Sequence, residues 1–200
     1  SPKTEILEAA LVEFSLQGKQ GARMQTIADN AGVNKAMLHY YFTNKDTLYA
    51  EVLQRLLSRG IGNVHRSFHE QATPRQQIEN LISNYFNFFR ENPELPRLLL
   101  WEVNVKPEAA TRMFSTMIEQ YEIPLPVLFE RAIRRGIEGG EFVPVDPRQY
   151  LLTVISTVAF YFLARPVVSK ILSIEDEEGF LDHREEHMKQ LLLAGIERSD

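Results

Sequence analysis

Two pairs of histidines have the spacing of a metal site. His65 and His69 are four residues apart, and His183 and His187 repeat that spacing. Two histidines one helical turn apart can bind zinc, but neither pair has an obvious third ligand beyond a neighbouring glutamate. Chance spacing on solvated helices is the simpler explanation. The chain has no cysteine and no nucleophile, phosphate-loop or nucleotide-binding motif, so we expect no metal, no cofactor and no enzyme activity.

The stretch from Thr26 to Leu48 has the spacing of two short helices joined by a tight turn and followed by a longer helix. Gly32 stands where a left-handed residue ends the first helix, and Asn34 can cap the second. Thr43 and Asp46 have the spacing of a capping box for the third. The apolar positions that face inward are Ile27, Ala28, Ala31, Val33, Leu38, Tyr41, Phe42 and Leu48. This pattern predicts a helix-turn-helix of the DNA-binding type, with the second helix as the recognition helix.

The net charge of −5 is unexpected for a protein that binds DNA. Residues 1–50 carry five basic and five acidic side chains, a net charge of zero. The remainder carries seventeen basic and twenty-two acidic side chains, a net charge of −5. Non-specific attraction to DNA should therefore be modest. Affinity has to depend on a few placed contacts and on two copies of the motif.

The helix-turn-helix stretch resembles the TetR family of transcriptional regulators. The positions that carry the resemblance are Thr26, Ile27, Ala28, Ala31, Gly32, Val33, Leu38, Tyr40, Tyr41, Phe42, Lys45 and Leu48. The resemblance is strong over the N-terminal quarter, whereas the rest of the chain is similar only in length and helical pattern. Two positions depart from the family's usual pattern. His39 stands where tyrosine is usual, and Ala36 stands where glycine is frequent.

The resemblance implies that the recognition helix, Asn34 to Tyr40, lies in the major groove, with phosphate contacts beside it. Lys35 could reach a guanine edge or a phosphate, and Lys45 at a helix N-terminus suits a phosphate. The alternative to DNA contact is a solvated surface position for His39 and a place in the core of the head for Tyr41. The expected DNA-contacting residues are Gln25, Thr26, Asn34, Lys35, Ala36, Met37, His39, Tyr40, Tyr41 and Lys45.

The remaining sequence has helical patterns only, so the expected fold class is all-α with about nine helices. A long helix should cover residues 44–71. A later helix that starts near Pro107 should kink or split between Tyr121 and Pro126. We expect an N-terminal three-helix DNA-binding head over residues 1–47. A larger helical domain for effector binding and dimerisation should follow over residues 48–200.

The apolar run from Tyr150 to Ala164 is too short for a membrane span, which needs about twenty residues. It also contains Thr153 and Ser156. A buried bundle or interface helix is the better interpretation, and we expect no membrane partner. There is no signal-peptide pattern, which indicates a cytoplasmic protein. The chain begins with Ser-Pro-Lys rather than Met, so residues ahead of Ser1 are expected to be missing.

In the family, the last two helices form a four-helix bundle with those of a second subunit. The helices expected over residues 147–165 and 179–197 fit that role and predict a homodimer. The first of them is apolar nearly all round, more than one side of a small monomer could bury. The alternative is a central helix within a single subunit.

The family's body usually holds a small-molecule pocket. Large, flexible or aromatic side chains with few charges favour a hydrophobic or aromatic effector, although for each of them alone a place in the core is the simpler interpretation. The expected lining residues are Tyr85, Phe86, Phe89, Trp101, Asn104, Met113, Met117, Tyr121 and Phe160. A ligand that prefers one spacing of the two heads would shift the protein away from its DNA-competent state.

The expected function is therefore that of a sequence-specific DNA-binding transcriptional regulator. Repression is the family default, and the effector would release the protein from a palindromic double-stranded DNA operator. The alternative is a helical ligand-sensing or protein-binding module without DNA binding. The neutral charge of the N-terminal quarter keeps that alternative open.

Overall fold

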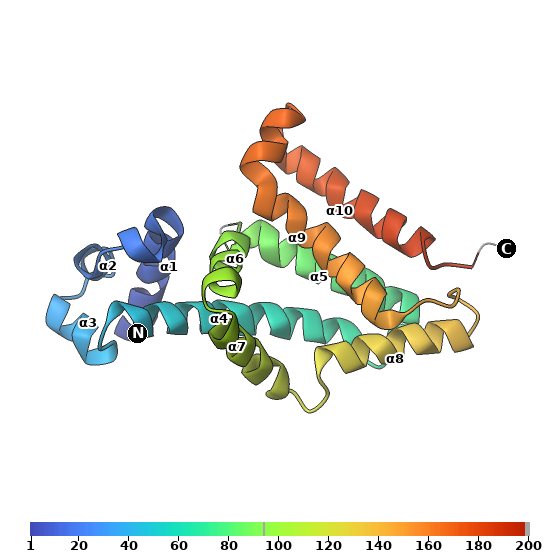
Figure 1. The fold of residues 1–200 in the computed structure, drawn as a ribbon, viewed down its shortest axis with the longest axis horizontal. Coiled ribbons are helices and arrows are strands. Elements are labelled where there is room, and N and C mark those ends of the chain that lie inside the picture. Colours follow the sequence, from blue (N-terminus) through green and yellow to red (C-terminus); the bar gives the residue numbers. More distant parts are fainter. Residues whose placement is uncertain (94, 199–200) are drawn as a thin grey trace. The chain divides into compact units, whose positions relative to one another are not determined.

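The computed structural model describes residues 1–93 and 95–198, without the side chains of Arg97 and Trp101. This part contains ten α-helices and one short 3-10 helix, which confirms the all-α expectation (Figure 1). The elements are α1 (Pro2–Gly21), α2 (Met24–Asn30), α3 (Lys35–Tyr41), α4 (Lys45–His65), η1 (Arg66–Phe68), α5 (Pro74–Glu91), α6 (Leu95–Val105), α7 (Pro107–Glu119), α8 (Leu125–Glu138), α9 (Pro147–Ile171) and α10 (Glu177–Ala194).

The helix expected from Pro107 onward is split in two, which accounts for the additional helix. α7 ends at Glu119, and α8 begins at Leu125 after Pro124, which adopts an extended conformation at the N-cap. Proline at this position has no backbone N–H to donate into a preceding turn, so a continuous helix is disfavoured.

Helix α4 differs from its prediction at both ends. Asn44, not Thr43, caps it, because the Asn44 side-chain oxygen accepts from the Thr47 backbone N–H at 2.9 Å. The C-terminal end is His65 rather than a residue near 71, and η1 follows. The change to a 3-10 turn buries Ser67, whose hydroxyl is 2.8 Å from the side-chain nitrogen of Asn84 on α5.

Helix α9 continues through Pro166 to Ile171, beyond the expected end near residue 165. Its start matches the prediction, because the Asp146 side chain caps it and accepts from the Arg148 backbone N–H at 2.8 Å. A proline inside a helix removes one hydrogen bond but does not stop a helix that is held by packing on either side.

The chain divides into two compact units, and α4 contributes residues to both. Unit 1 comprises residues 1–59 and 98–113, and unit 2 comprises residues 60–97 and 114–200. In unit 1, α1 packs on α2, and α2 packs on α3. The side chains in its core with no exposed surface are Ile6, Ala10, Phe14, Ile27, Ala28, Leu38, Phe42 and Leu48.

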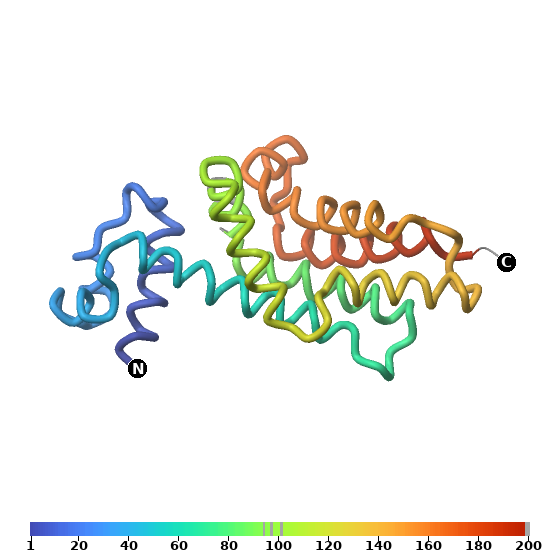
Figure 2. The backbone as a smooth tube through the Cα atoms, turned by 60° about the horizontal axis from the view of Figure 1, so that its bottom comes forward, coloured from blue at the N-terminus to red at the C-terminus, as the bar shows by residue number. Residues whose placement is uncertain are grey.

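In unit 2, α5 is the central helix and packs on α8, α9 and α10. Figures 1 and 2 show α9 and α10 side by side and antiparallel. The ring of Phe162 on α9 lies 5.2 Å from that of Phe86 and 5.8 Å from that of Phe89, both on α5. Two buried α9 tyrosines are hydrogen-bonded: the Tyr150 hydroxyl donates to the Leu192 carbonyl at 2.9 Å, and the Tyr161 hydroxyl contacts Glu177.

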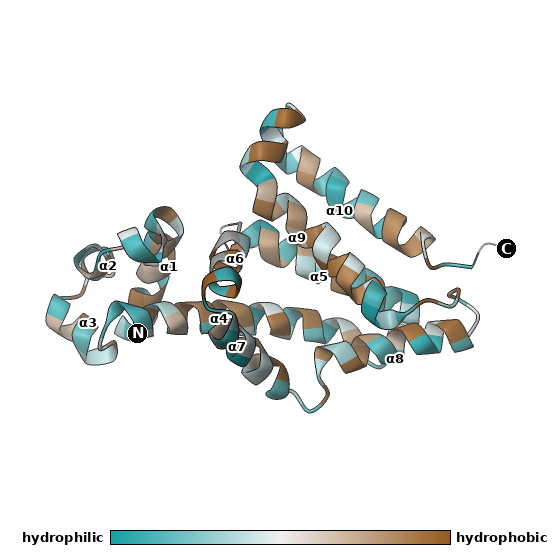
Figure 3. Ribbon diagram, viewed as in Figure 1, coloured by the Kyte–Doolittle hydropathy of each residue, from teal (hydrophilic) through white to brown (hydrophobic). Residues whose placement is uncertain are grey.

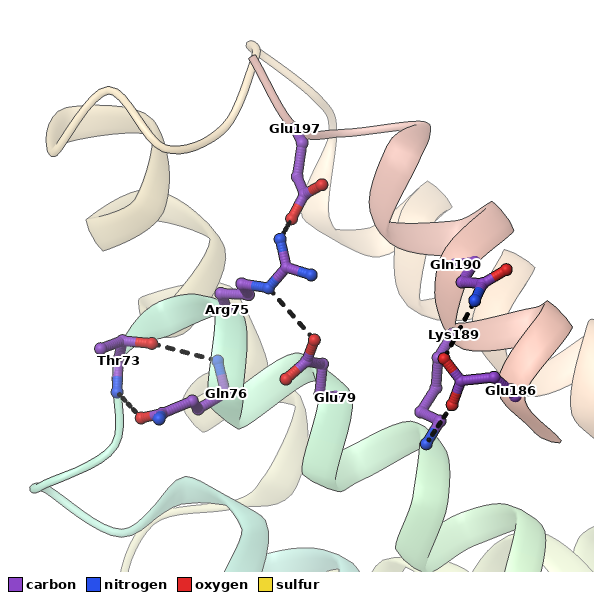
Figure 4. A network of polar contacts seen from close by, with 8 residues as sticks. All are labelled: Thr73, Arg75, Gln76, Glu79, Glu186, Lys189, Gln190 and Glu197. Atoms are coloured by element: carbon purple, nitrogen blue, oxygen red, sulfur yellow. Dashed lines mark hydrogen bonds and ion pairs between the residues drawn. The ribbon is translucent and has the colours of Figure 1, made fainter. Parts of the chain in front are cut away.

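Polar contacts join α5 to the C-terminal segment at the surface of unit 2 (Figure 4). Arg75 on α5 pairs with Glu79 at 3.1 Å and also with Glu197. A capping box begins α5, because Thr73 and Gln76 exchange side-chain to backbone hydrogen bonds of 3.0 and 3.2 Å. Exposed ion pairs contribute little stability, so these contacts add little to the packing of the C-terminal segment on α5.

Gly60 on α4 allows a close approach of α5. A Cβ atom at this position would lie 2.4 Å from the ring of Phe88. Phe88 is itself buried, so its ring has little room to move. The glycine is therefore a packing requirement as well as a weak point of the helix.

We predict that Gly60→Ala lowers the free energy of unfolding by about 1–2 kcal/mol, because overpacking outweighs the gain in helix propensity. Urea unfolding at fixed protein concentration measures this change. In a double-mutant cycle with Phe88→Leu, the two substitutions should be coupled, because the smaller side chain relieves the clash. Simple additivity of the two effects would contradict this interpretation.

Candidate nucleic-acid interface

The turn between α2 and α3 is built as the sequence predicts. Gly32 has a φ of 65°, in the left-handed region that glycine adopts without strain. Its backbone N–H donates to the Asp29 carbonyl at 3.1 Å, and that of Val33 donates to the Ala28 carbonyl at 3.0 Å. The Asn34 side chain then caps α3 by accepting from the Met37 backbone N–H at 2.8 Å. The turn thus fixes the direction in which α3 leaves α2.

Leu38 and Phe42 anchor α3, because neither has any exposed surface. The opposite side of the helix is consequently free. Tyr40 is 84% exposed, Met37 39% and Tyr41 37%. The other α3 positions predicted to contact DNA, together with the cap residue, are also exposed: Asn34, Lys35, Ala36 and His39.

Unit 1 also fixes the start of α2 electrostatically. The buried carboxylate of Glu13 on α1 accepts from the backbone N–H of Arg23, the N-cap residue of α2, at 3.1 Å. A negative charge at this position stabilises the helix N-terminus. Of the two predicted contact residues on α2, Thr26 is half-buried. The exposed Gln25 donates to Asp29 at 2.8 Å.

Lys45 has a role inside unit 1 that the sequence does not reveal. Its ammonium group donates to the carbonyls of Gln20 and Ala22 at 3.0 and 3.1 Å. These bonds hold the end of α1 against the start of α4. An ammonium group has three protons, so one remains for an external acceptor.

The electrostatic character of α3 differs from that of the head as a whole. Helix α3 carries Lys35 and His39 and no carboxylate. Nearby in unit 1, Lys19 pairs with Asp46 at 3.1 Å, which keeps the pKa of that carboxyl below its usual value. The exposed face of α3 is therefore locally cationic although residues 1–50 are neutral.

The residues expected to line an effector pocket do not share one environment. Phe86, Phe89 and Met117 are buried in unit 2, whereas Phe160 is 60% exposed. Tyr85 and Tyr121 are half-buried. In unit 1, Met113 is half-buried, and Asn104 is exposed and donates to the Leu100 carbonyl of its own helix at 2.7 Å. The side chain of Trp101 lies outside the described residues.

Helix α9 is rich in apolar residues, which colour much of its length brown in Figure 3, and these residues lie on two faces. One face packs in unit 2 through Tyr150, Val154, Val158, Tyr161 and Phe162. The other is exposed and carries Leu152 (61% exposed), Ile155 (40%), Phe160 (60%), Leu163 (37%) and Val167 (59%). By length and composition alone, α9 could also cross a membrane.

A cavity of about 610 Å³ lies in unit 2, and its lining contains none of the predicted pocket residues whose side chains the structure describes, although Tyr121 stacks on the lining residue His65. In the sequence, His65 and His69 at its edge stand out only as a spaced pair, and nothing predicts a role for Arg131 and Arg135. The available signal was the four-residue spacing of the two arginines on one helix. Within the described residues, no three histidine, aspartate or glutamate side chains are grouped closely enough to hold a metal ion.

Two family models match the chain. The model for bacterial regulatory proteins of the tetR family matches residues 6–52, and the model for the tetracyclin repressor-like C-terminal domain matches residues 74–192. The second match alone spans more than half of the chain.

The chain is similar over most of its length to known regulators. It is 26% identical over 198 residues to the HTH-type transcriptional regulator RutR of Escherichia coli K12, which covers 97% of this chain and 90% of RutR. It is 29% identical over 170 residues to the HTH-type transcriptional repressor SCO4008 of Streptomyces coelicolor, covering 85% of this chain and 82% of that protein.

A solved structure has the same fold. The transcriptional regulator FadR from Bacillus subtilis, in complex with stearoyl-CoA, has a TM-score of 0.71 at 18% identity, covering 96% of this chain and 98% of that one. The helix-turn-helix geometry and both family matches lead to one conclusion. This chain belongs to the tetR family of bacterial regulatory proteins and is a DNA-binding transcriptional regulator.

Proposed function

We propose that the chain is a repressor that places α3 in the major groove of a palindromic operator. The observation that carries this proposal is the division of α3 into a buried side, Leu38 and Phe42, and an exposed side without carboxylates. A helix anchored in this way can present its polar face rigidly to base edges. In this proposal residues 1–47 bind DNA, and residues 48–200 bind the effector and dimerise.

The proposed DNA contacts fall into two kinds. Lys35 and Met37 are placed to meet base edges, where Lys35 can donate to guanine and Met37 can contact a thymine methyl. The exposed Tyr40 hydroxyl, His39 and Lys45 are suited to phosphate oxygens. The remaining proposed contacts are Gln25, Thr26, Asn34, Ala36 and Tyr41.

We further propose that the exposed face of α9, together with α10, forms the homodimer interface. Exposed leucine, isoleucine, phenylalanine and valine side chains on a single helix face favour association with another apolar surface. A second copy supplies an identical surface in a two-fold arrangement and brings two heads to one operator. This assignment favours a cytoplasmic protein over one whose α9 enters a membrane.

The proposed effector is a small, largely hydrophobic or aromatic molecule. The FadR structure contains stearoyl-CoA, a ligand with a long apolar acyl chain, and this supports an apolar part in the proposed effector. Binding would bias the equilibrium between two arrangements of the heads, and a ligand acts only through its difference in affinity for them. Helix α4 is proposed to transmit the effect of the ligand to the DNA-binding head, because it has residues in both units. No catalytic role is proposed.

Selection of genomic DNA fragments with the purified protein tests the function. We expect recovery of fragments that share a near-palindromic sequence, with half-sites about one helical turn of DNA apart. Binding should tolerate competitor DNA of unrelated sequence. Recovery of fragments without a shared sequence would contradict operator recognition.

We predict that Lys35→Ala weakens operator binding and, if the ammonium group contacts a phosphate, reduces the slope of log affinity against log salt by about one. If Lys35 instead reads a base, discrimination at that base pair should fall while the slope changes less. Arg134→Ala is the matched control, because it removes one exposed positive charge from α8 in unit 2. If the Lys35 variant keeps the parental affinity, slope and sequence preference, as the control should, Lys35 has no role in DNA binding.

We predict that Leu152→Glu weakens dimerisation by about 100-fold, because an unpaired carboxylate would be buried in the interface at a cost of about 3 kcal/mol. Sedimentation equilibrium measures the dissociation constant. Thr116→Glu, at an exposed position on α7, introduces the same charge outside the proposed interface and should leave the dimer intact. An unchanged dimer in the Leu152 variant would exclude this face of α9.

A further inference from the structure

The cavity of about 610 Å³ in unit 2 has the size of a small-molecule site. It lies where the end of α4 and η1 meet the beginning of α5 and one side of α8. These elements pack directly on one another, because α5 contacts both η1 and α8. The cavity therefore has walls from three parts of the sequence that only the fold brings together.

The walls of the cavity combine apolar and cationic surface. Phe68 and Ala132 are buried and form an apolar floor, to which Leu128 adds a half-buried side chain. Arg66 from η1 and Arg131 and Arg135 from α8 also line the cavity, and all three are exposed. A molecule in this space would meet apolar carbon on one side and guanidinium groups on another.

The cationic lining is opposite in sign to the rest of unit 2. Unit 2 carries 13 basic and 19 acidic side chains, a net charge of −6. The cavity is lined by three arginines against two carboxylates, Glu70 and Glu122, and also by His65 and His69. With both histidines neutral, the local charge is +1. A random distribution of the charged side chains over this acidic unit would instead favour a negative charge in the cavity lining.

The arginines on α8 differ in their ion pairing: among the described residues, Arg134 has an ion-pair partner, whereas the cavity arginines do not. Arg134 is not part of the cavity lining and pairs with Glu130 at 2.6 Å. Within the described part of the chain, Arg131 and Arg135 have no ion-pair partner. They are one helical turn apart, where like charges repel each other. A bound anion would relieve this repulsion and could accept bidentate hydrogen bonds.

We propose that this cavity binds an amphipathic organic anion, with its carboxylate or phosphate group at Arg66, Arg131 and Arg135 and its apolar part on Phe68 and Leu128. The inference deepens the proposed effector-binding role, on which it rests, by naming the class of ligand. A largely hydrophobic effector with one anionic group satisfies both parts of the lining.

The cavity is also connected to the end of α4. The His65 ring nitrogen is 3.1 Å from the Ile123 carbonyl, and its ring stacks on Tyr121 with centroids 4.3 Å apart. Ile123 and Glu122 form one edge of the cavity. A ligand that displaces this edge would therefore act on the C-terminal turn of α4 through His65.

Isothermal titration calorimetry with octanoate, octyl phosphate and 1-octanol tests the proposal on the purified protein. The three probes share one alkyl chain and differ in the head group. Both anions should bind, and 1-octanol should bind at least about tenfold more weakly, because it cannot make charge-assisted hydrogen bonds. The two anionic arms distinguish a carboxylate from a phosphate as the preferred group.

The double variant Arg131→Gln/Arg135→Gln should bind both anions about tenfold or more weakly. Arg66→Gln gives an independent test from η1, and thermal melting verifies that each variant is folded. Arg134→Gln is the matched control on the same helix and should keep the parental affinity.

Parental affinity in both cavity variants, equal affinity for 1-octanol, or no binding of either anion at millimolar concentration would overturn the proposal. The titration contains no DNA, so its failure is distinguishable from a failure to bind an operator.

Discussion

Helix α9 has apolar side chains on both faces, and unit 2 covers only one of them. Tyr150, Val154 and Phe162 are buried, whereas Leu152 and Val167 are largely exposed. Exposing such a surface to water costs a free energy of about 25 cal/mol for each Å² of apolar area. A second copy of the chain is the simplest cover, and it would also provide the second DNA-binding head that a neutral head needs.

The need for a second head follows from the charge of the first. Residues 1–50 are neutral, so long-range attraction to the phosphate backbone is weak. The structure compensates by rigidity: buried Leu38 and Phe42 fix α3, and Lys45 ties α1 to α4. A rigidly held α3 can make a few well-placed contacts to DNA, and such contacts favour specific binding over non-specific binding. Linking two heads then raises the overall affinity, because the second head binds at a high effective concentration once the first is bound.

The sequence predicts those parts of the molecule that local signals determine. Asn34 caps α3 as expected, and α9 begins at residue 147 as expected, after the Asp146 cap. Thr43 and Asn44 are both residue types that cap helices, so local spacing does not decide between them, and in the structure Asn44 caps α4. The cavity could not be predicted, because Arg66 and Arg131 are far apart in the sequence and only the packing of η1, α5 and α8 brings them together.

In the proposed dimer, two weak heads act together on one operator. The most direct test is the affinity of the protein for the full palindromic operator compared with a duplex that carries a single half-site, at the same salt concentration. Linked heads should bind the full operator about 100-fold or more tightly, through the high effective concentration of the second head. Equal affinity for the two duplexes would contradict the account.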